Sequence, residues 1–433
     1  MLKKTVGKCL LRAEIRQRKL EKRSSRKCPA DVMVWFVVAM WLYGDDCYTH
    51  VFRWLHRFSR GKMPSSSALT QARARIGVPI LAAVYRKVVR CLCSSQTLGA
   101  FYAGRRLVAV DGFVLNLPDS DQNRRAFGRP KNGTSLGAFP QARMIALCEV
   151  GSRVFFSFLA KPIRCGEATM ARHVYRDLPP NSLLLFDIGF CAYRLMQQVM
   201  DQKSDFLGRS KTNRLFQKMQ VLSDGSYLSK IYATDYDRVH DRDGQTVRVM
   251  EYTLNDPQRV GDGEEHRLVT TLLDEKEHPA ETLIVLYHER WEEEIAIDEA
   301  KTHLRNSPKL RSHSPAGVMQ EIYGLLTAHF VLRNLALEAA ALAGVSPRRI
   351  SFTGTINVLR VSLVEAPRSP RLISEWYENL ISEISLQLLE PRRNRINPRV
   401  IKRPQSKWPK KRQKHRNPPP LKQTFEETIR VLT

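Results

Sequence analysis

Apolar residues recur with a helical period near both ends of the chain. The most apolar run covers residues 32–43, an amphipathic stretch follows over 48–58, and a Pro-Ser turn introduces a third over 68–77. This spacing predicts three helices in the amino-terminal part. The period returns toward the carboxyl end, where we predict helices over 320–344, 354–364 and 371–389.

Between these regions the apolar residues form short runs that are typical of strands. From residue 207 to about 279 the runs become shorter and alternate with Asp-Gly turns, which predicts a β-rich insertion. Together the two patterns indicate an α/β protein. The predicted strands cover 106–112, 142–150, 153–159, 182–186, 227–232, 247–254 and 268–273, with a helix over 167–178.

Polar residues take helical spacing in the stretch that follows this insertion. At about 100° per residue, separations of three, four and seven positions put four polar side chains on one helical stripe. A phenol, a guanidinium, a carboxylate and an ammonium then face the same place. The stripe consists of Tyr287, Arg290, Glu294 and Lys301.

Three consecutive glutamates occur in this stretch, and the helical period distinguishes among them. Glu294 lies seven residues from both Tyr287 and Lys301, which is nearly two full turns. Glu292 and Glu293 point elsewhere on the same helix, so we expect them to be surface charges. A solvated helix with an i,i+4 pair between Arg290 and Glu294 gives the same pattern, and that alternative stays open at this point.

Two predicted strands each end in an aspartate. Asp111 follows the run 106–110 and Asp187 follows 182–186. Aspartate after a strand is also a common turn starter, so each residue alone is weak evidence for a functional site. Neighbouring strands would bring the two carboxylates together, and a flanking helix could add Glu294.

The third amino-terminal helix has the features of a DNA-recognition helix. The segments over 48–58 and 68–77 with their connecting turn resemble a helix-turn-helix, a motif without a strict sequence code. An ordinary small helical bundle fits the same pattern. Side chains suited to base edges and phosphates are Gln71, Arg73 and Arg75.

The net charge of +27 points to a polyanionic partner. Residues 1–30 hold eleven basic and two acidic residues, and 391–423 hold thirteen basic and none acidic. We expect the amino-terminal segment to be a flexible or weakly helical arm and the proline-rich carboxyl tail not to pack in a core.

The spacing of the cysteines and the length of the longest apolar run indicate the cellular compartment. Eight cysteines occur without a Cys-x-x-Cys pair, so neither a zinc site nor a disulfide framework is indicated. The run 32–43 is far shorter than the roughly 20 residues that a membrane-spanning helix needs. We expect a cytoplasmic protein with no membrane partner.

The spacing Tyr-x2-Arg-x3-Glu-x6-Lys resembles the signature of bacterial DDE transposases of the insertion-sequence-four family. Ser-Ala-x-x-Gln-Ala-Arg at 67–73 and Arg-Ile-Ser-Phe at 349–352 are similar to segments of the same family. The resemblance covers roughly 30–365. It implies a ribonuclease-H-like catalytic core, double-stranded DNA as partner, two Mg²⁺ or Mn²⁺ ions, a dimer that pairs two element ends, and a nucleoid-associated location in a bacterium.

The resemblance also implies roles for individual residues. Asp111, Asp187 and Glu294 would be catalytic metal ligands, while Tyr287, Arg290 and Lys301 would contact a terminal phosphate of the DNA. Guanidinium and ammonium groups suit phosphate oxygens, and a phenol donates one hydrogen bond.

The implied organisation divides the chain into five segments. Two alternatives to an active transposase are a DNA-binding protein that has lost cleavage and a basic RNA-binding protein, which leaves the three carboxylates unused. The segments are 1–100, basic arm and helical DNA-binding domain; 101–206, first part of the core; 207–279, β-rich insertion; 280–365, second part of the core; and 366–433, carboxyl-terminal helices and basic tail.

We predict that deleting residues 391–433 reduces the salt dependence of DNA binding. Each Lys or Arg that neutralises a phosphate releases a counterion, so fewer contacts give a flatter slope of log affinity against log salt concentration. The slope is measured on duplex DNA across a salt series. An unchanged slope would mean that the tail does not touch DNA.

Overall fold

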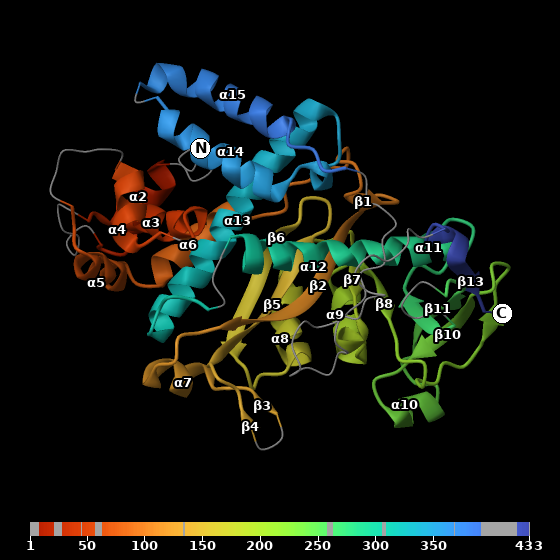
Figure 1. The fold of residues 1–433 in the computed structure, drawn as a ribbon. Coiled ribbons are helices and arrows are strands. Elements are labelled where there is room, and N and C mark those ends of the chain that lie inside the picture. The colour runs from red at the N-terminus through yellow and green to blue at the C-terminus, as the bar shows by residue number, and fades with distance from the viewer. Residues whose placement is uncertain are drawn as a thin grey trace. The chain divides into compact units, whose positions relative to one another are not determined.

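The computed structural model describes residues 8–20, 28–44, 46–56, 63–132, 135–257, 263–304, 309–367, 369–390 and 422–432. The chain folds into two compact units (Figure 1). The first unit comprises Met1–Leu178 and Trp291–Leu389, and the second comprises Pro179–Arg290 and Glu390–Thr433. The chain therefore crosses between the units three times.

Two apolar helices form the core of the helical part of the first unit. Ten of the thirteen residues of α3 (Ala30–Leu42) are buried, and this helix packs against α13 (Pro315–Ala343). Gly324 permits the close approach, because a Cβ at this position would lie 2.7 Å from the Val37 side chain. The surrounding helices are α4 (Tyr48–His56), α5 (Ser66–Ile76), α6 (Pro79–Val88), α14 (Phe352–Glu365) and α15 (Ile373–Ser385).

By length and composition α13 is apolar enough to cross a membrane, but 72% of its most apolar segment is buried inside the protein. It also carries buried polar side chains that bond within the first unit. The Gln320 amide, for example, donates to the carbonyls of Arg73, at 2.8 Å, and Gly77, at 3.0 Å. We therefore interpret α13 as a core helix.

The described part of the amino-terminal arm is more ordered than its sequence indicates, while residues 1–7 and 21–27 lie outside the described residues. Residues 8–17 form α2 (Lys8–Gln17), which buries Leu11 and Ile15. Glu14 of this helix pairs with Lys87 of α6. The irregular apolar spacing hides this helix, because the contacts that stabilise it come from α3 and α6.

Three long antiparallel strands form the sheet of the first unit in the order β6-β5-β2. They are β2 (Arg105–Asn116), β5 (Gln141–Glu149) and β6 (Val154–Pro162), and the short β1 (Phe101–Tyr102) pairs with β2. Asp111 pairs with Ala146 in the middle of β2. The prediction that a strand ends at Asp111 is thus wrong, because Gly112 continues the ladder to Asn116.

Short elements complete the first unit. Helix α8 (Glu167–Val174) packs on β5 and β6, and α12 (Trp291–Asp298) packs against β2 and β5. The latter continues directly into a π-helix over Glu299–His303. The remaining elements are α7 (Asp121–Phe127), β3 (Lys131–Asn132), β4 (Ser135–Leu136) and 3-10 turns at Tyr175–Asp177, Pro347–Arg349 and Pro370–Leu372.

The second unit contains a mixed sheet in the order β7-β8-β12-β11-β10-β9. Strands β7 (Ser182–Phe186) and β8 (Asp205–Arg209) are parallel and are joined by α9 (Tyr193–Asp201). The others are antiparallel: β9 (Gln220–Val221), β10 (Tyr227–Ile231), β11 (Gln245–Leu254) and β12 (His266–Thr270). The strands predicted in the β-rich segment are therefore present, and β12 joins them to β8 in the same sheet.

The end of the chain packs on this sheet, contrary to the prediction for the carboxyl tail. Strand β13 (Ile429–Val431) pairs with β11 from Tyr252 to Leu254. The ring centroids of Phe425 and His288 are 3.6 Å apart. Thr428, which belongs to the 3-10 turn Glu426–Thr428, is buried. Residues 391–421 lie outside the described residues. Helices α10 (Asp235–Val239) and α11 (Ala280–Tyr287) complete this unit.

We expect deletion of residues 422–433 to destabilise the second unit. The deletion removes the β13 ladder and uncovers β11, and each lost backbone hydrogen bond costs about 0.5–1.5 kcal/mol. Thermal unfolding measures the effect. Arg430→Ala, which removes an exposed side chain of the same strand, is the matched control and should leave the melting temperature unchanged. Equal melting temperatures for the deletion and the intact chain would contradict this packing.

Candidate active site

Asp187 stands at the carboxyl end of β7 in the second unit. Its Oδ1 accepts a hydrogen bond of 2.8 Å from the backbone N–H of Ile188 and caps a 3-10 turn over Ile188–Phe190. The turn-starter reading of this aspartate therefore describes its local geometry correctly. A carboxylate keeps further acceptor positions after one such bond, so the turn also holds it ready for a second ligand.

Arg209 lies level with Asp187 on the neighbouring parallel strand. The register pairs Phe186 with Gly208, so Asp187 and Arg209 are the next residues of the two strands, and Arg209 still pairs with Leu268 of β12. The Arg209 guanidinium contacts Nδ1 of His266 at 3.0 Å. Sequence reasoning missed Arg209, because only the pairing of β7 with β8 identifies it as a neighbour of the aspartate.

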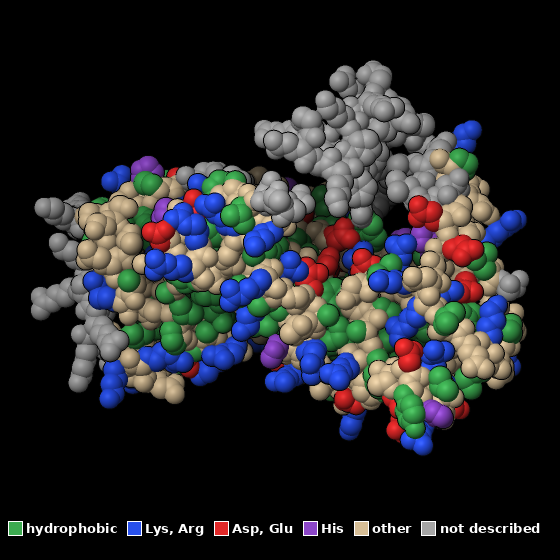
Figure 2. Space-filling model, turned by 90° about the horizontal axis from the view of Figure 1, so that it is seen from below, with side chains coloured by type: hydrophobic (Ala, Val, Ile, Leu, Met, Phe, Trp, Pro, Cys, Tyr) green, Lys and Arg blue, Asp and Glu red, His purple; other side chains and the backbone are tan. Residues whose placement is uncertain are grey.

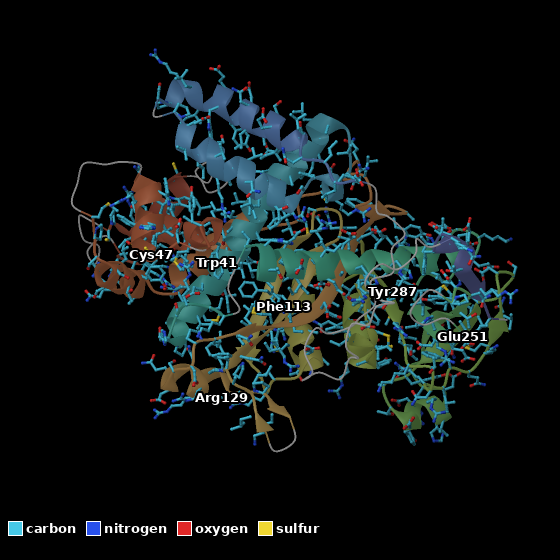
Figure 3. All side chains as sticks on the ribbon, viewed as in Figure 1. Trp41, Cys47, Phe113, Arg129, Glu251 and Tyr287 are labelled. Carbon is cyan, nitrogen blue, oxygen red and sulfur yellow. The ribbon has the colours of Figure 1, made fainter. Side chains whose placement is uncertain are left out.

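Tyr287 ends α11 close to the same strand ends (Figure 3). Its hydroxyl donates to the Phe186 carbonyl at 3.2 Å. Burial raises the pKa of Tyr287 well above its usual range, the Arg290 guanidinium opposes this shift, and the Asp187 carboxylate adds to it. The charges of Asp187, Arg209 and Arg290 thus all influence the pKa of this buried phenol in the second unit.

The predicted single helix over 287–301 is interrupted. Helix α11 ends at Tyr287, a 3-10 turn covers His288–Arg290, α12 follows, and a π-helix begins at Glu299. These turns have different periods, so an angular stripe calculated at 3.6 residues per turn does not hold throughout. Tyr287 and Arg290 belong to the second unit, whereas Glu294 and Lys301 belong to the first.

Glu292 and Glu293 are not surface charges. Their exposed fractions are 2% and 0%, and Glu292 accepts hydrogen bonds from Arg153. The prediction that these two carboxylates are surface charges is therefore wrong, and removing Glu292 would leave the charge of its buried partner Arg153 uncompensated. Glu294 is only partly buried.

Asp111 and Glu294 are carried by elements that touch each other in the first unit. Asp111 lies on β2, against which α12 packs, and its Oδ1 accepts from the N–H of Gly112 at 2.7 Å. Phe113, two residues further along β2, marks this part of the strand in Figure 3. Asp111 and Glu294 are both half-buried, as expected of residues that meet a ligand.

A further carboxylate, Glu167 of α8, lies beside this strand. A Cβ on Gly112 would be 2.8 Å from the Glu167 carboxyl carbon, so the glycine leaves room for that side chain. Arg143 of β5 donates to Glu167 at 3.1 Å. Nothing in the sequence singles out Glu167, which reads as an ordinary acidic residue in the first turn of a helix.

The donor chemistry suits a hard divalent cation. Within the described ranges, no three His, Cys, Asp or Glu side chains come together as a metal site. Asp111, Glu294 and Asp187 nevertheless offer carboxylate oxygens, which Mg²⁺ and Mn²⁺ prefer, and the first two stand on packed elements of one unit. The residues present therefore fit such an ion by type.

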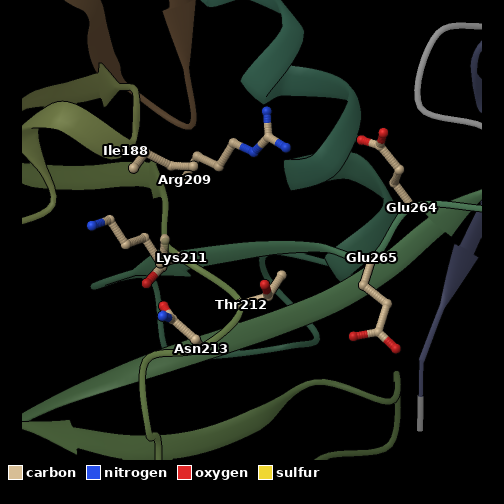
Figure 4. Close-up of a pocket in the computed structure, with 8 residues that line it drawn as sticks. Ile188, Arg209, Lys211, Thr212, Asn213, Glu264 and Glu265 are labelled. Atoms are coloured by element: carbon tan, nitrogen blue, oxygen red, sulfur yellow. The ribbon is translucent and has the colours of Figure 1, made fainter.

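A cavity of about 480 Å³ opens beside Ile188 in the second unit. Arg209 and Lys211 contribute cations to it, and Glu264 and Glu265 stand on the other side (Figure 4). The hydroxyl of buried Ser210, which also lines the cavity, has no hydrogen-bond partner among the described residues. The cavity is thus lined by charges of both signs, beside the residue that follows Asp187. The other lining residues are Thr212 and Asn213.

The three candidates for DNA recognition on α5 differ in position. Gln71 and Arg75 are exposed, but only 4% of Arg73 is exposed. Arg73 donates to the hydroxyls of Tyr48 and Ser312, at 2.5 and 3.2 Å, and to the Gly317 carbonyl. Assigning Arg73 to DNA is therefore a mistake, because its donors are occupied inside the first unit.

Basic side chains are not confined to the ends of the chain. Figure 2 shows Lys and Arg side chains spread over the face that it presents, mixed with apolar side chains. The described surface can therefore bind a polyanion as well.

Arg73 and Arg75 provide a matched test. We expect Arg73→Ala to destabilise the protein by about 3 kcal/mol, the typical cost of breaking a buried ion pair, since Glu321 lies 3.7 Å away. Arg75→Ala should keep the melting temperature and weaken DNA binding. Chemical unfolding and a DNA-binding titration of both variants distinguish them, and the opposite pattern would show that the roles of the two residues are reversed.

Comparisons with known proteins agree with these features. The family described as "Transposase DDE domain" matches residues 102–331, and "Insertion element 4 transposase N-terminal" matches residues 2–86. Transposase InsG for insertion sequence element IS4 of Escherichia coli (strain K12) is 27% identical over 394 residues, 89% of this chain and 87% of that protein. Putative transposase InsZ of the same strain is 29% identical over 176 residues, 40% of this chain and 57% of that protein.

A solved structure is also similar. The piggyBac transposase synaptic complex with hairpin DNA, determined by cryo-EM, has a TM-score of 0.44 and 11% identity, covering 87% of this chain and 84% of that chain. A likeness at this level carries no functional argument. The match to the DDE domain covers more than half of the chain. This chain therefore belongs to the transposase DDE domain family, whose members cleave DNA and transfer its strands.

Proposed function

We propose that this transposase binds the inverted terminal repeats of an insertion element, cuts the DNA there and joins the free 3′-hydroxyl ends to target DNA. The observation that carries the proposal is the packing of α12 against β2, since these elements carry Glu294 and Asp111. Asp187, which follows β7 in the second unit, is the third carboxylate. In this proposal all three are metal ligands and catalytic residues.

Two Mg²⁺ or Mn²⁺ ions, when bound, activate the attacking oxygen and stabilise the leaving oxygen of the phosphodiester. The three carboxylates hold the ions, and the partial burial of Asp111 and Glu294 limits their motion. Asp187 is steadied further by its bond to the Ile188 N–H. Carboxylates that are already held in place need to move less when the reaction occurs, which lowers its barrier.

Cationic residues in each of the two units are suited to the DNA backbone. Arg290 and Lys301 follow the family spacing and contact a terminal phosphate in this proposal, with Tyr287 donating a hydrogen bond when the phosphate competes for its hydroxyl. Arg209 joins this set because β8 places it level with Asp187. A planar guanidinium binds two phosphate oxygens at once.

The other regions are assigned to DNA binding and assembly. We propose that the helical domain within 1–100 recognises the terminal repeats through Gln71 and Arg75, and that segment 207–279 is the β-rich insertion of a ribonuclease-H-like core. The core then comprises 101–206 and 280–365, with 366–433 as carboxyl-terminal helices and basic tail. Two copies act together because two element ends must be held, and the site of action is the bacterial cytoplasm.

A catalytically inactive DNA-binding protein is the alternative. It would use the same basic surface and the same helical domain, but it would not need carboxylates at positions 111, 187 and 294. The presence of all three at the positions of the family motif favours the active enzyme.

We expect Asp111→Ala, Asp187→Ala and Glu294→Gln each to reduce cleavage of element-end DNA by more than about 100-fold, because loss of even an outer partner of a metal ligand costs about 10- to 100-fold. DNA binding should survive, and EDTA should abolish cleavage by the unaltered protein. Gel-based cleavage assays with Mg²⁺ and Mn²⁺ measure both effects.

The matched control is Glu281→Gln, an exposed glutamate of α11, which should cleave normally. Full activity of Asp187→Ala would refute the assignment of the metal ligands.

A further inference from the structure

A buried cluster of five charged or polar side chains lies behind the helix that carries Glu294. Arg153, at the turn between β5 and β6, donates from Nε to Glu292 at 2.6 Å and from Nη1 to Glu299 at 3.1 Å. Arg333 of α13 donates to both carboxylate oxygens of Glu299, from Nε at 2.8 Å and from Nη2. His329 completes what we call the Glu299 cluster, with Nε2 at 3.1 Å from the same carboxylate.

The charges of the Glu299 cluster balance inside the protein. All five residues are buried, and burial together with the charge of Arg153 lowers the pKa of His329 to about 3, so this imidazole is neutral near pH 7. Its Nε2 therefore carries a hydrogen and donates to Glu299. The two arginines of the cluster then face its two glutamates, and the partly exposed Arg348 lies 4.0 Å from Glu292 at the edge of the cluster.

A balanced buried cluster is a poor source of stability and a good source of orientation. Apolar side chains of similar size are often as stabilising as a buried ion pair, because desolvation offsets the Coulomb attraction. The directional bonds of the Glu299 carboxylate, which Arg333 holds with two donors and Arg153 with one, in contrast favour one arrangement. The Glu299 cluster therefore fixes how three elements meet: the β5–β6 turn, α12 with its π-helix, and α13.

The Glu299 cluster holds the side of α12 that lies opposite to Glu294. Glu292 and Glu299 are seven residues apart, and Glu294 and Lys301 repeat the same spacing two residues later. Two residues correspond to about 200° on an α-helix, so Glu294 lies on the side opposite to Glu292. Contacts that hold one side of α12 therefore fix the rotation of the helix about its axis, and with it the position of Glu294.

The π-helix starts at a clamped residue. The N–H of Leu304 donates to the Glu299 carbonyl at 3.0 Å, a bond that spans five residues and widens this turn. Lys301 lies inside the widened turn. Because the Glu299 side chain is held by Arg153 and Arg333, the same contacts fix the place where the wide turn begins.

We propose that Arg153 and Arg333 are positioning residues for DNA cleavage: through Glu292 and Glu299 they set the rotation of α12 and the start of the π-helix, and thereby the positions of Glu294 and Lys301. This inference rests on the proposed role of Glu294 as a metal ligand. The cluster itself touches neither metal nor DNA in this scheme.

The test compares two buried glutamates of the first unit. Glu292→Gln weakens the clamp with little change in shape. Glu321→Gln alters a buried carboxylate of α13 that is bonded to Ser312 and to the Arg311 N–H and is paired with Arg73, so it too weakens a buried ion pair, but one outside the Glu299 cluster. We expect Glu292→Gln to raise the Mn²⁺ concentration for half-maximal cleavage about tenfold, the size of effect seen for outer partners of metal ligands. Glu321→Gln should keep the normal Mn²⁺ requirement.

A second variant guards against a failure to fold. Arg153→Met with Glu292→Met removes one buried charge of each sign, and Arg348, the other cation near Glu292, is partly exposed to water. A buried pair replaced in this way is often as stable as before. Thermal unfolding and end-DNA binding establish that each variant is intact. Calorimetric titration of the intact protein with Mn²⁺ then measures metal affinity without any cleavage step, and we expect it to fall in both variants.

The outcomes separate this inference from the proposed function. Folded variants with an unchanged Mn²⁺ affinity and requirement would overturn the positioning role. Glu294→Gln is titrated in parallel and should bind Mn²⁺ weakly. Normal Mn²⁺ binding by Glu294→Gln would instead refute the metal-ligand assignment, whichever result the variants at 153 and 292 give.

Discussion

The burial of the Glu299 carboxylate between Arg153 and Arg333 is the interaction on which the arrangement of α12 in the first unit depends. It joins three separate elements: the turn between β5 and β6, the π-helix that continues α12, and α13. A carboxylate enclosed in this way cannot lose one partner without leaving a charge unpaired, so the three elements hold one arrangement. The hydrophobic packing of α3 on α13 contributes to the core of the same unit, while the cluster determines the orientation of α12.

In the second unit, the pairing of backbone strands positions the charged side chains. Parallel pairing of β7 and β8 makes both strands end at the same edge, so Asp187 and Arg209 emerge together. Tyr287 closes this edge through its bond to the Phe186 carbonyl, and Gly208 leaves room for the Phe186 ring, which a Cβ would approach to 1.9 Å. The carboxyl-terminal strand β13 then covers β11 of the same sheet.

These two arrangements suit metal-dependent phosphodiester chemistry for one physical reason. A metal ligand must be an oxygen held in place, and phosphate recognition needs cations at a fixed distance from it. Rigid strands, a helix clamped from behind and a capped turn each restrict a carboxylate without consuming all its acceptor positions.

The sequence by itself determined the main features of this protein: the long helices, most core strands, the family motif and its candidate carboxylates, because local periodicity and spacing carry that information. Several features depended on contacts between distant residues and were decided only by the tertiary structure. Asp111 lies inside β2 because β5 extends the ladder, Arg73 is internal because α13 covers it, and Glu292 is buried because Arg153, 139 positions earlier, is its partner. Arg209 becomes a neighbour of Asp187 only through strand pairing. A one-dimensional pattern gives the face of a helix, but which side chains meet that face is fixed by how distant segments pack.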